Sequence, residues 1–184
     1  MSEPNAYEQG AENVKLFDSL FASYHESVLR YCVRRLGPSE AEDAAADVFA
    51  VAWRRLEEIP DGESARAWLI GVAYKVVGNR YRSRRRGARL RERLRSETMS
   101  STAVESEVPL QSILLALEEL SPADRELIRL ASWDGLSRSE IAHVLGIRVN
   151  AVDQRMHRAR GRLKNHYDRL FPMVTPSRPE EAPL

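Results

Sequence analysis

Apolar residues recur at every third or fourth position along most of the chain, and no sustained stretch alternates apolar and polar residues as a strand would. This spacing gathers apolar side chains on one face of an α-helix, which can then pack against a neighbouring helix. The chain is therefore predicted to be all-α.

The N-terminal half predicts four or more helices before the linker, separated by short breaks. The first is predicted to end at Gly37-Pro38, because glycine and proline both interrupt helices. Its apolar stripe, predicted to be core, consists of Leu16, Phe17, Leu20, Phe21, Tyr24, Val28 and Tyr31. Ser39 followed by Glu42 has the pattern of a capping box that opens a second helix. The predicted buried face of that helix is Ala45, Val48, Phe49, Ala52 and Leu56.

A third helix is predicted over residues 65–86, after a turn-rich break at residues 59–62. Its predicted inward residues are Leu69, Val72, Val76 and Tyr81. Its opposite face carries Lys75, Asn79 and Arg82. Beyond this helix, residues 87–109 lose the apolar pattern and gain serine, threonine, glutamate and arginine, which is typical of a linker whose first part can extend the preceding helix.

This break divides the chain into two small helical domains joined by a flexible linker. The predicted bounds are residues 14–90 for the first domain, 91–108 for the linker and 109–171 for the second domain. Residues 172–184 contain prolines among serine, threonine and glutamate, a composition that cannot bury a core, and this tail is expected to be disordered.

The second domain begins with an apolar stripe formed by Leu110, Ile113, Leu114, Leu117 and Leu120. Ser121-Pro122 then predicts an N-cap followed by proline at the first helical position. That next helix continues inward with Leu127, Ile128 and Ala131 and is closed by Asp134-Gly135.

A helix-turn-helix is predicted at the end of this domain. Ser137 and Glu140 form a capping box, and Gly146 stands where a short helix ends in the left-handed conformation. A second helix begins near Val149. It turns inward the residues Val152, Met156, Ala159 and Leu163 and keeps outside Asp153, Gln154, Arg155, His157, Arg158 and Arg160. The alternative is a plain helical hairpin with an exposed basic face.

Charge is distributed unevenly, although 28 basic and 27 acidic residues nearly cancel over the whole chain. Residues 38–63 hold eight acidic residues against two arginines, whereas residues 80–95 hold nine arginines against one glutamate. Residues 148–169 are basic again. A charge run can be no more than a solvated helix face, but arginine dominates both basic runs, and its planar guanidinium suits phosphate and base contacts. The two runs therefore predict nucleic-acid contact.

Other chemistry is limited by composition. The single cysteine, Cys32, cannot form an intramolecular disulfide, and four scattered histidines offer no metal-ligand spacing, so neither a metal nor a cofactor is expected. The acidic residues are spread over helix surfaces and no glycine-rich phosphate loop is present, so an enzyme is not expected. The most apolar run, residues 68–77, is too short for a bilayer span, and a cytoplasmic location is expected without membrane insertion.

The segment at residues 135–163 reads GLSRSEIAHVLGIRVNAVDQRMHRARGRL and resembles the minus-thirty-five reading domain of bacterial sigma factors of the extracytoplasmic function (ECF) group. Three N-terminal segments resemble that group's core-binding and minus-ten reading domain: FDSLFASYHESVLRYCVRRLG, AEDAAADVFAVAWRRL and ARAWLIGVAYKVVGNRYRSRRR. The resemblance covers residues 14–170 and implies a transcription initiation factor that directs core RNA polymerase to promoters.

Several positions depart from the usual pattern of the group. Ala46 and Asp47 replace a common Gln-Glu pair, and Lys75 replaces a common asparagine. Asn150-Ala151 stands where Gly-Thr is usual, and Asp153 replaces a commonly basic residue. The bases read by this chain are therefore not implied by the resemblance.

The resemblance implies three sets of contact residues. The polymerase-binding set is Asp43, Asp47, Phe49, Trp53 and Arg54. The minus-ten DNA-binding set is Glu63, Ser64, Trp68, Lys75, Asn79, Arg80, Arg82, Arg84 and Arg85. The minus-thirty-five set is Arg148, Asn150, Asp153, Gln154, Arg155, His157, Arg158 and Arg160. Core burial is the alternative for Phe49 and Trp68, and the turn at residues 58–64 is expected to border a pocket for an extruded base.

The implied partners are core RNA polymerase and promoter DNA, with an anti-sigma protein as a further candidate. Residues 87–108 can extend to roughly 70 Å at about 3.3 Å per residue, comparable with two duplex turns of about 34 Å each. One chain can therefore reach both promoter elements. A stand-alone helix-turn-helix regulator is the main alternative, although it leaves the first domain unexplained, and a helical adaptor that only sequesters a partner is another.

Overall fold

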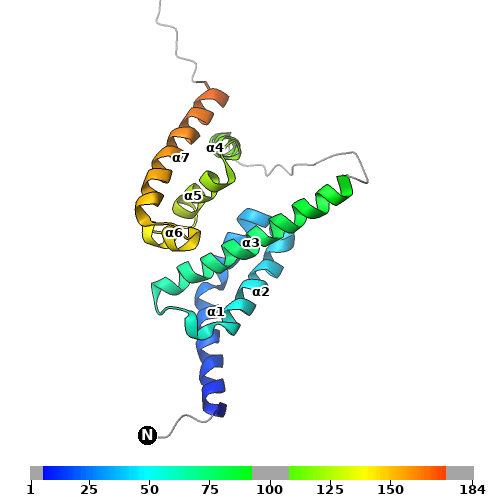
Figure 1. The fold of residues 1–184 in the computed structure, drawn as a ribbon, viewed down its shortest axis with the longest axis vertical. Helices are drawn as coiled ribbons and strands as arrows, with labels where there is room; N and C mark the ends of the chain where they lie inside the picture. Colours follow the sequence, from blue (N-terminus) through cyan, green and yellow to red (C-terminus); the bar gives the residue numbers. More distant parts are fainter. Residues whose placement is uncertain (1–5, 93–107, 173–184) are drawn as a thin grey trace, which may run out of the picture.

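The computed structural model describes residues 6–92 and 108–172, and every regular element within these ranges is helical (Figure 1). The first domain contains α1 (Ala6–Leu36), α2 (Pro38–Arg54), the short 3₁₀ helix η1 (Leu56–Glu58) and α3 (Glu63–Glu92). The second contains α4 (Val108–Glu118), α5 (Pro122–Ser132), α6 (Arg138–Leu145) and α7 (Val149–Leu170). The all-α prediction with two helical domains is confirmed.

The core of the first domain lies where α1, α2 and α3 pack against one another. All five residues predicted for the inner face of the second helix are buried, and so are Leu69 and Val72 of α3. The predicted stripe of α1 is only partly correct, because Leu16 is 53% exposed and Phe21 is 40% exposed. These two residues lie on the N-terminal half of α1, which extends beyond the other helices of the bundle (Figure 1).

Two further expectations for the first domain are wrong. Tyr81 does not face inward: it is 42% exposed, and its hydroxyl donates a hydrogen bond to the backbone carbonyl of Arg35 at the end of α1. Ser39 does not cap the second helix, because α2 begins at Pro38 and its N-cap is Gly37, two positions before Ser39. Proline has no backbone N–H and its φ is already helical, so it is well suited to open a helix without a side-chain cap.

The helix ends of the second domain follow the local sequence closely. The Ser121 side chain accepts a hydrogen bond from the backbone N–H of Asp124 at the start of α5. Ser137 and Glu140 form both hydrogen bonds of a capping box at the start of α6. Gly146 then ends α6 with φ 64°, a left-handed conformation that glycine adopts without the steric cost of a side chain. These features confirm the helix-turn-helix of α6 and α7.

The two domains pack against each other, which the sequence did not predict. The N-terminal half of α3 crosses α6 (Figure 1). Buried residues of both domains belong to one apolar cluster. The two helices approach closely at Gly71, where a Cβ atom would lie 3.9 Å from the Cα of Val144. α3 continues to Glu92, so the expected extension of this helix into the linker is present. Residues 93–107 and 173–184, which include most of the predicted linker and tail, lie outside the described residues.

Candidate nucleic-acid interface

Helix α2 presents an acidic and aromatic surface to solvent. Asp43, Asp47, Trp53 and Arg54 from the predicted polymerase-binding set are all exposed on it. Phe49 differs, because it is only 4% exposed and packs with its ring centroid 4.8 Å from that of Phe21. Phe49 therefore supports this surface from beneath and is not itself available to a partner, which corrects its assignment as a contact residue.

Helix α3 carries a stripe of polar residues on its outer face. Lys75, Asn79 and Arg82 are exposed at helical spacing, and the Arg82 guanidinium donates to the side-chain oxygen of Asn79. Ser64 and Trp68 continue the stripe toward the N-terminus of the helix. The side chains of Glu63 and Arg85, two further members of the predicted minus-ten set, lie outside the described residues.

Trp68 is half-buried, which agrees in part with a core residue and in part with a DNA contact. It packs against the edge of the core, and the Arg55 guanidinium lies 5.7 Å from its ring centroid. Arg55 is in turn bound by Glu58, whose carboxylate accepts from its Nε at 2.9 Å. The hydrogen bond and charge of Arg55 lower the pKa of Glu58, so this carboxylate stays ionised beside the start of α3.

Two arginines of the predicted minus-ten set are bound by the acidic helix. Arg80 forms an ion pair with Asp47 at 2.6 Å, and Arg84 forms an ion pair with Glu40. Both pairs join α3 to α2. The structure therefore brings a predicted polymerase contact, Asp47, against a predicted DNA contact, Arg80, although the sequence places them in separate acidic and basic surfaces.

A hollow of about 180 Å³ lies between α1 and the turn that precedes α3. Its lining includes Ile59, Pro60, Asp61 and Gly62 from the turn, and Tyr24 from α1. The Tyr24 hydroxyl donates to the carbonyl of Gly62 at 3.0 Å and so fixes the turn to α1. The turn at residues 58–64, which was expected to border a pocket, therefore does line a hollow on the surface.

Helix α7 presents the predicted minus-thirty-five residues on its free face. Exposed side chains follow the helix from its N-terminus, namely Arg148, Asn150, Gln154, Arg155, His157, Arg158 and Arg160. Asp153 is more enclosed and forms an ion pair with Arg138 of α6 at 3.0 Å, so its charge is partly neutralised. A basic face over a capped helix-turn-helix can enter a major groove with its arginines against phosphates.

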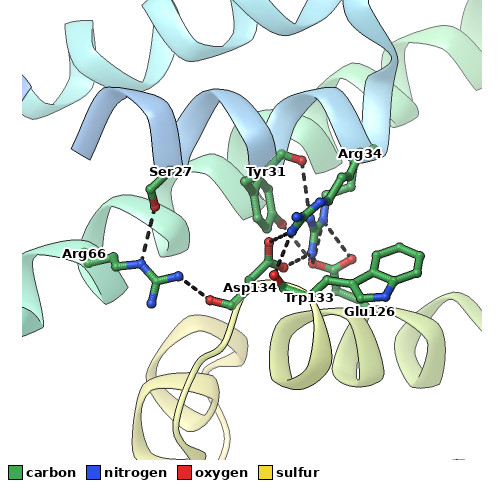
Figure 2. A network of polar contacts seen from close by, with 8 residues as sticks. Ser27, Tyr31, Arg34, Arg66, Glu126, Trp133 and Asp134 are labelled. Atoms are coloured by element: carbon green, nitrogen blue, oxygen red, sulfur yellow. Dashed lines mark hydrogen bonds and ion pairs between the residues drawn. The ribbon is translucent and has the colours of Figure 1, made fainter. Parts of the chain in front are cut away.

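The sequence missed a polar cluster at the junction of the two domains (Figure 2). Arg35 near the C-terminus of α1 donates through Nε to both carboxylate oxygens of Glu126, at 3.0 and 3.1 Å, and through Nη2 to Asp134 at 2.6 Å. Tyr31 donates to the same Glu126 carboxylate at 2.9 Å. Burial and then the charge of Glu126 raise the pKa of Tyr31 well above its ordinary value, so Tyr31 is neutral and serves as a donor.

No local signal in the sequence identifies this cluster. Arg34 and Arg35 read as ordinary basic residues in the last turn of a helix, and Asp134 reads as part of a helix stop. The partners are 91 to 100 residues apart in the chain, so their meeting depends on how the domains pack.

Within the described ranges, no helix is long and apolar enough to cross a membrane, and no group of three or more histidine, cysteine or acidic side chains is placed to hold a metal ion.

Comparison with known proteins now decides the family. Residues 20–87 match the Sigma-70 region 2 family, and residues 110–163 match Sigma-70, region 4. The chain belongs to the ECF sigma factors. The ECF sigma factor SigL of Mycobacterium tuberculosis is 32% identical, over 81% of this chain and 87% of SigL. The sigma factor CnrH of Cupriavidus metallidurans is 30% identical, over 86% of this chain and 90% of CnrH.

The solved structure of CnrH in complex with the cytosolic domain of CnrY is also similar, with a TM-score of 0.59 and 28% identity over 83% of this chain and 88% of CnrH. As an ECF sigma factor, the protein is a transcription initiation factor that directs RNA polymerase to promoters and binds core polymerase and promoter DNA. Region 2 accounts for the first domain, which a stand-alone helix-turn-helix regulator leaves unexplained, so that alternative is not favoured.

Proposed function

We propose that three exposed surfaces divide the work of this sigma factor, with α2 binding core polymerase, α3 and the adjacent hollow taking the minus-ten element, and α7 reading the minus-thirty-five element. The observation that carries this proposal is the separation of charge and exposure among the three helices. The acidic face lies on α2, a polar stripe lies on α3, and α7 is basic over its free face. The proposed working units are residues 14–90 and 109–171.

The polymerase contact is proposed for Asp43, Asp47, Trp53 and Arg54. Acidic side chains around an exposed tryptophan suit a basic partner surface with apolar character, because tryptophan and arginine supply much of the binding energy at protein interfaces. Phe17 stacks edge-on against Trp53 with centroids 5.2 Å apart and holds the indole in place. The contact surface is thus supported from α1.

The minus-ten element is proposed to bind along the α3 stripe with one base extruded into the hollow at residues 59–62. Extrusion costs a few kcal/mol, which stacking and hydrogen bonds in a pocket must offset. Lys75, Asn79 and Arg82 are proposed to hold the strand beside that base, with Ser64 and Trp68 nearer the turn. Glu63, Arg80, Arg84 and Arg85 remain proposed flanking contacts.

The minus-thirty-five element is proposed to receive the N-terminal part of α7. Asn150, Asp153, Gln154 and His157 are proposed to face base edges, since glutamine suits adenine and a carboxylate can accept from cytosine. Arg148, Arg155, Arg158 and Arg160 are proposed to contact phosphates, which fix the register of the helix on the duplex.

The sigma factor is proposed to act by binding alone, with all bond formation left to the polymerase, and to work in the cytoplasm where polymerase and DNA meet. An anti-sigma protein is a proposed further partner. The support for it is the similar CnrH, whose structure is a complex with the cytosolic domain of CnrY.

Run-off transcription with purified core polymerase over a genomic promoter library tests the proposal. We expect specific start sites only when the chain is present, and their loss with Asp43→Arg, a charge reversal in the acidic face. Glu12→Arg is the matched control, because it makes the same charge change at an exposed position of α1 outside the proposed surfaces. Start sites that survive Asp43→Arg, or that fail equally with Glu12→Arg, contradict the assignment of α2.

A further inference from the structure

The junction between the two domains is built like a protein interior rather than like a loose contact. Val144 of α6 is 5% exposed where α6 meets α3, and buried residues of both domains belong to one apolar cluster. Gly71 lies at this contact, where a Cβ atom would be 3.9 Å from the Cα of Val144, an ordinary van der Waals distance. Apolar residues buried in this way are removed from water only while the domains stay together.

A charged network lies beside this apolar contact (Figure 2). The Arg35 side chain is 1% exposed and forms ion pairs with Glu126 at 2.9 Å and Asp134 at 2.6 Å, whose side chains are 14% and 4% exposed. Burial lowers the pKa of Arg35, but Tyr31, Glu126 and Asp134, which face it, raise the pKa by more, so the guanidinium remains charged. The first domain supplies the cation and the second domain supplies both carboxylates.

The same arginine-rich edge also binds the C-terminal end of α5. Arg34 donates to the carbonyl of Trp133 at 2.7 Å, and Arg66 donates to the carbonyl of Asp134 and to the Ser27 hydroxyl. The last carbonyls of a helix lack partners within the helix and carry partial negative charge, so cations are stabilised there. These contacts define one relative position of the domains, because each donor reaches its acceptor only in that position.

This closed position conflicts with simultaneous reading of two promoter elements. The proposed minus-ten helix α3 packs against α6, the helix before the reading helix α7, so the two domains are held close together while both reading faces stay exposed. The two elements are about two duplex turns apart, each turn being about 34 Å. The chain between Glu92 and Val108 is long enough to let the domains separate by tens of ångströms, at about 3.3 Å per residue.

We propose that the ion pairs of Arg35 with Glu126 and Asp134 form a latch that holds this sigma factor in a closed form unable to engage both promoter elements, so that the domains must separate before initiation. The proposal rests on the proposed assignment of α3 and α7 to the two elements. Its specificity comes from the buried charges: separating the domains requires Arg35, Glu126 and Asp134 to be rehydrated together, and a displaced arrangement leaves one of them buried without a partner.

A reversible crosslink tests the closed form directly. Gly71→Cys with Val144→Cys places two thiols at the α3–α6 contact, where a Cβ atom at residue 71 would lie 3.9 Å from the Cα of Val144. Cys32 does not compete, because it is buried and burial raises the pKa of its thiol to about 11, which leaves little thiolate near neutral pH. We expect the pair to oxidise readily in the full-length chain, and each single cysteine variant to remain uncrosslinked.

Transcription by the same protein then separates the outcomes. We expect at least a tenfold loss of promoter-specific starts in the oxidised form and recovery after reduction, with no effect of oxidant on the single variants. Failure of the pair to crosslink, or full activity of the crosslinked chain, overturns the latch. Wild-type protein that gives no promoter-specific starts instead contradicts the proposed function, so the two failures are distinguishable.

A second set of variants tests the network itself without depending on the activity of the cysteine pair. Glu126→Gln with Asp134→Asn keeps side-chain size but removes both charges that face Arg35. We expect crosslinking in the cysteine background to slow at least tenfold, and transcription in an otherwise native chain at limiting sigma concentration to rise several-fold. Glu12→Gln with Glu118→Gln is the matched control, because both residues are exposed. An unchanged crosslinking rate overturns the role of the network.

Discussion

Helices α3 and α7 are both rich in arginine, but they use their arginines differently. On α3, Arg80 and Arg84 turn toward α2 and pair with Asp47 and Glu40. On α7, Arg155 and Arg158 are exposed on the free face of the helix, and no ion pair to an acidic side chain is found for them in the described structure. A count of basic residues therefore overstates the positive charge that α3 can offer to DNA.

The two helices also differ in what positions them. The turn that leads into α7 is set by Gly146 at the end of the capped helix α6, and α7 then packs against α4, α5 and α6 through buried residues such as Val152 and Ala159. The position of α3 along α2 is marked by ion pairs between partly exposed side chains, which salt weakens. The comparison shows that two helices with similar arginine content can differ in function: the arginines on the free face of α7 are available to bind a partner, whereas two arginines of α3 are already paired with acidic residues of α2.

The largest expected effect is on duplex DNA that contains the minus-thirty-five element. Arg155→Ala with Arg158→Ala removes two free phosphate contacts, and we expect affinity to fall roughly 10- to 100-fold and the salt dependence to become shallower by about two. Binding of labelled duplex at several salt concentrations measures both. Arg162→Ala is the control, because Arg162 is paired with Asp124 instead of lying on the reading face. An equal loss with Arg162→Ala would break the distinction between free and paired arginines.

A smaller effect separates the two kinds of basic residue on α3. Lys75→Ala with Arg82→Ala removes side chains of the exposed stripe, and we expect about a tenfold loss of binding to minus-ten DNA. Arg80→Ala with Arg84→Ala removes the same charge from paired positions, and we expect a loss of threefold or less. Binding of holoenzyme to single-stranded minus-ten DNA makes the comparison. A larger loss of affinity with Arg80→Ala and Arg84→Ala than with Lys75→Ala and Arg82→Ala would indicate that Arg80 and Arg84 leave Asp47 and Glu40 when DNA binds.

Local chemistry explains which parts of this structure the sequence predicts. The caps at Ser121, Ser137 and Gly146 depend on residues within a few positions of one another, and all three are confirmed. The cap at Ser39 is wrong because the neighbouring Pro38 opens the helix first. Periodicity identifies the face of α1 but not how completely its neighbours cover that face, so Phe21 is 40% exposed although it packs against Phe49.

Long-range contacts explain the rest. Arg35 meets Glu126 across 91 residues, and Arg80 meets Asp47 across 33 residues. Neither pairing leaves a local pattern, since a buried arginine and an exposed arginine look alike in a helix sequence. The contact sets on α2, α3 and α7 stay predictions until binding is measured, although the structure removes Phe49 from the accessible members.

The turn that positions α7 gives the next prediction. Gly146→Ala forces a residue with a Cβ atom into φ 64°, and we expect the free energy of unfolding to fall by about 1 kcal/mol. Gly161→Ala is a matched control of opposite sign, because Gly161 lies within α7 with open space around it and alanine favours helix by about 0.8–1.0 kcal/mol. Denaturant unfolding of both variants measures the difference. Equal shifts in the same direction would show that the turn does not position α7.

The smallest expected effect concerns the pairing that joins α3 to α2. Asp47→Asn, Arg80→Gln and the double variant form a cycle that isolates the interaction of the two side chains. The Arg80 and Asp47 side chains are 25% and 58% exposed, so we expect a coupling of about 0.2–1 kcal/mol in low salt that largely disappears near 1 M salt. A coupling free energy that persists in high salt would indicate that the ion pair is shielded from solvent. The pair would then hold α3 to α2 even at high ionic strength. A coupling of zero at low salt would instead leave Arg80 free to join the exposed stripe, and the difference between the two basic helices would be one of position rather than of available charge.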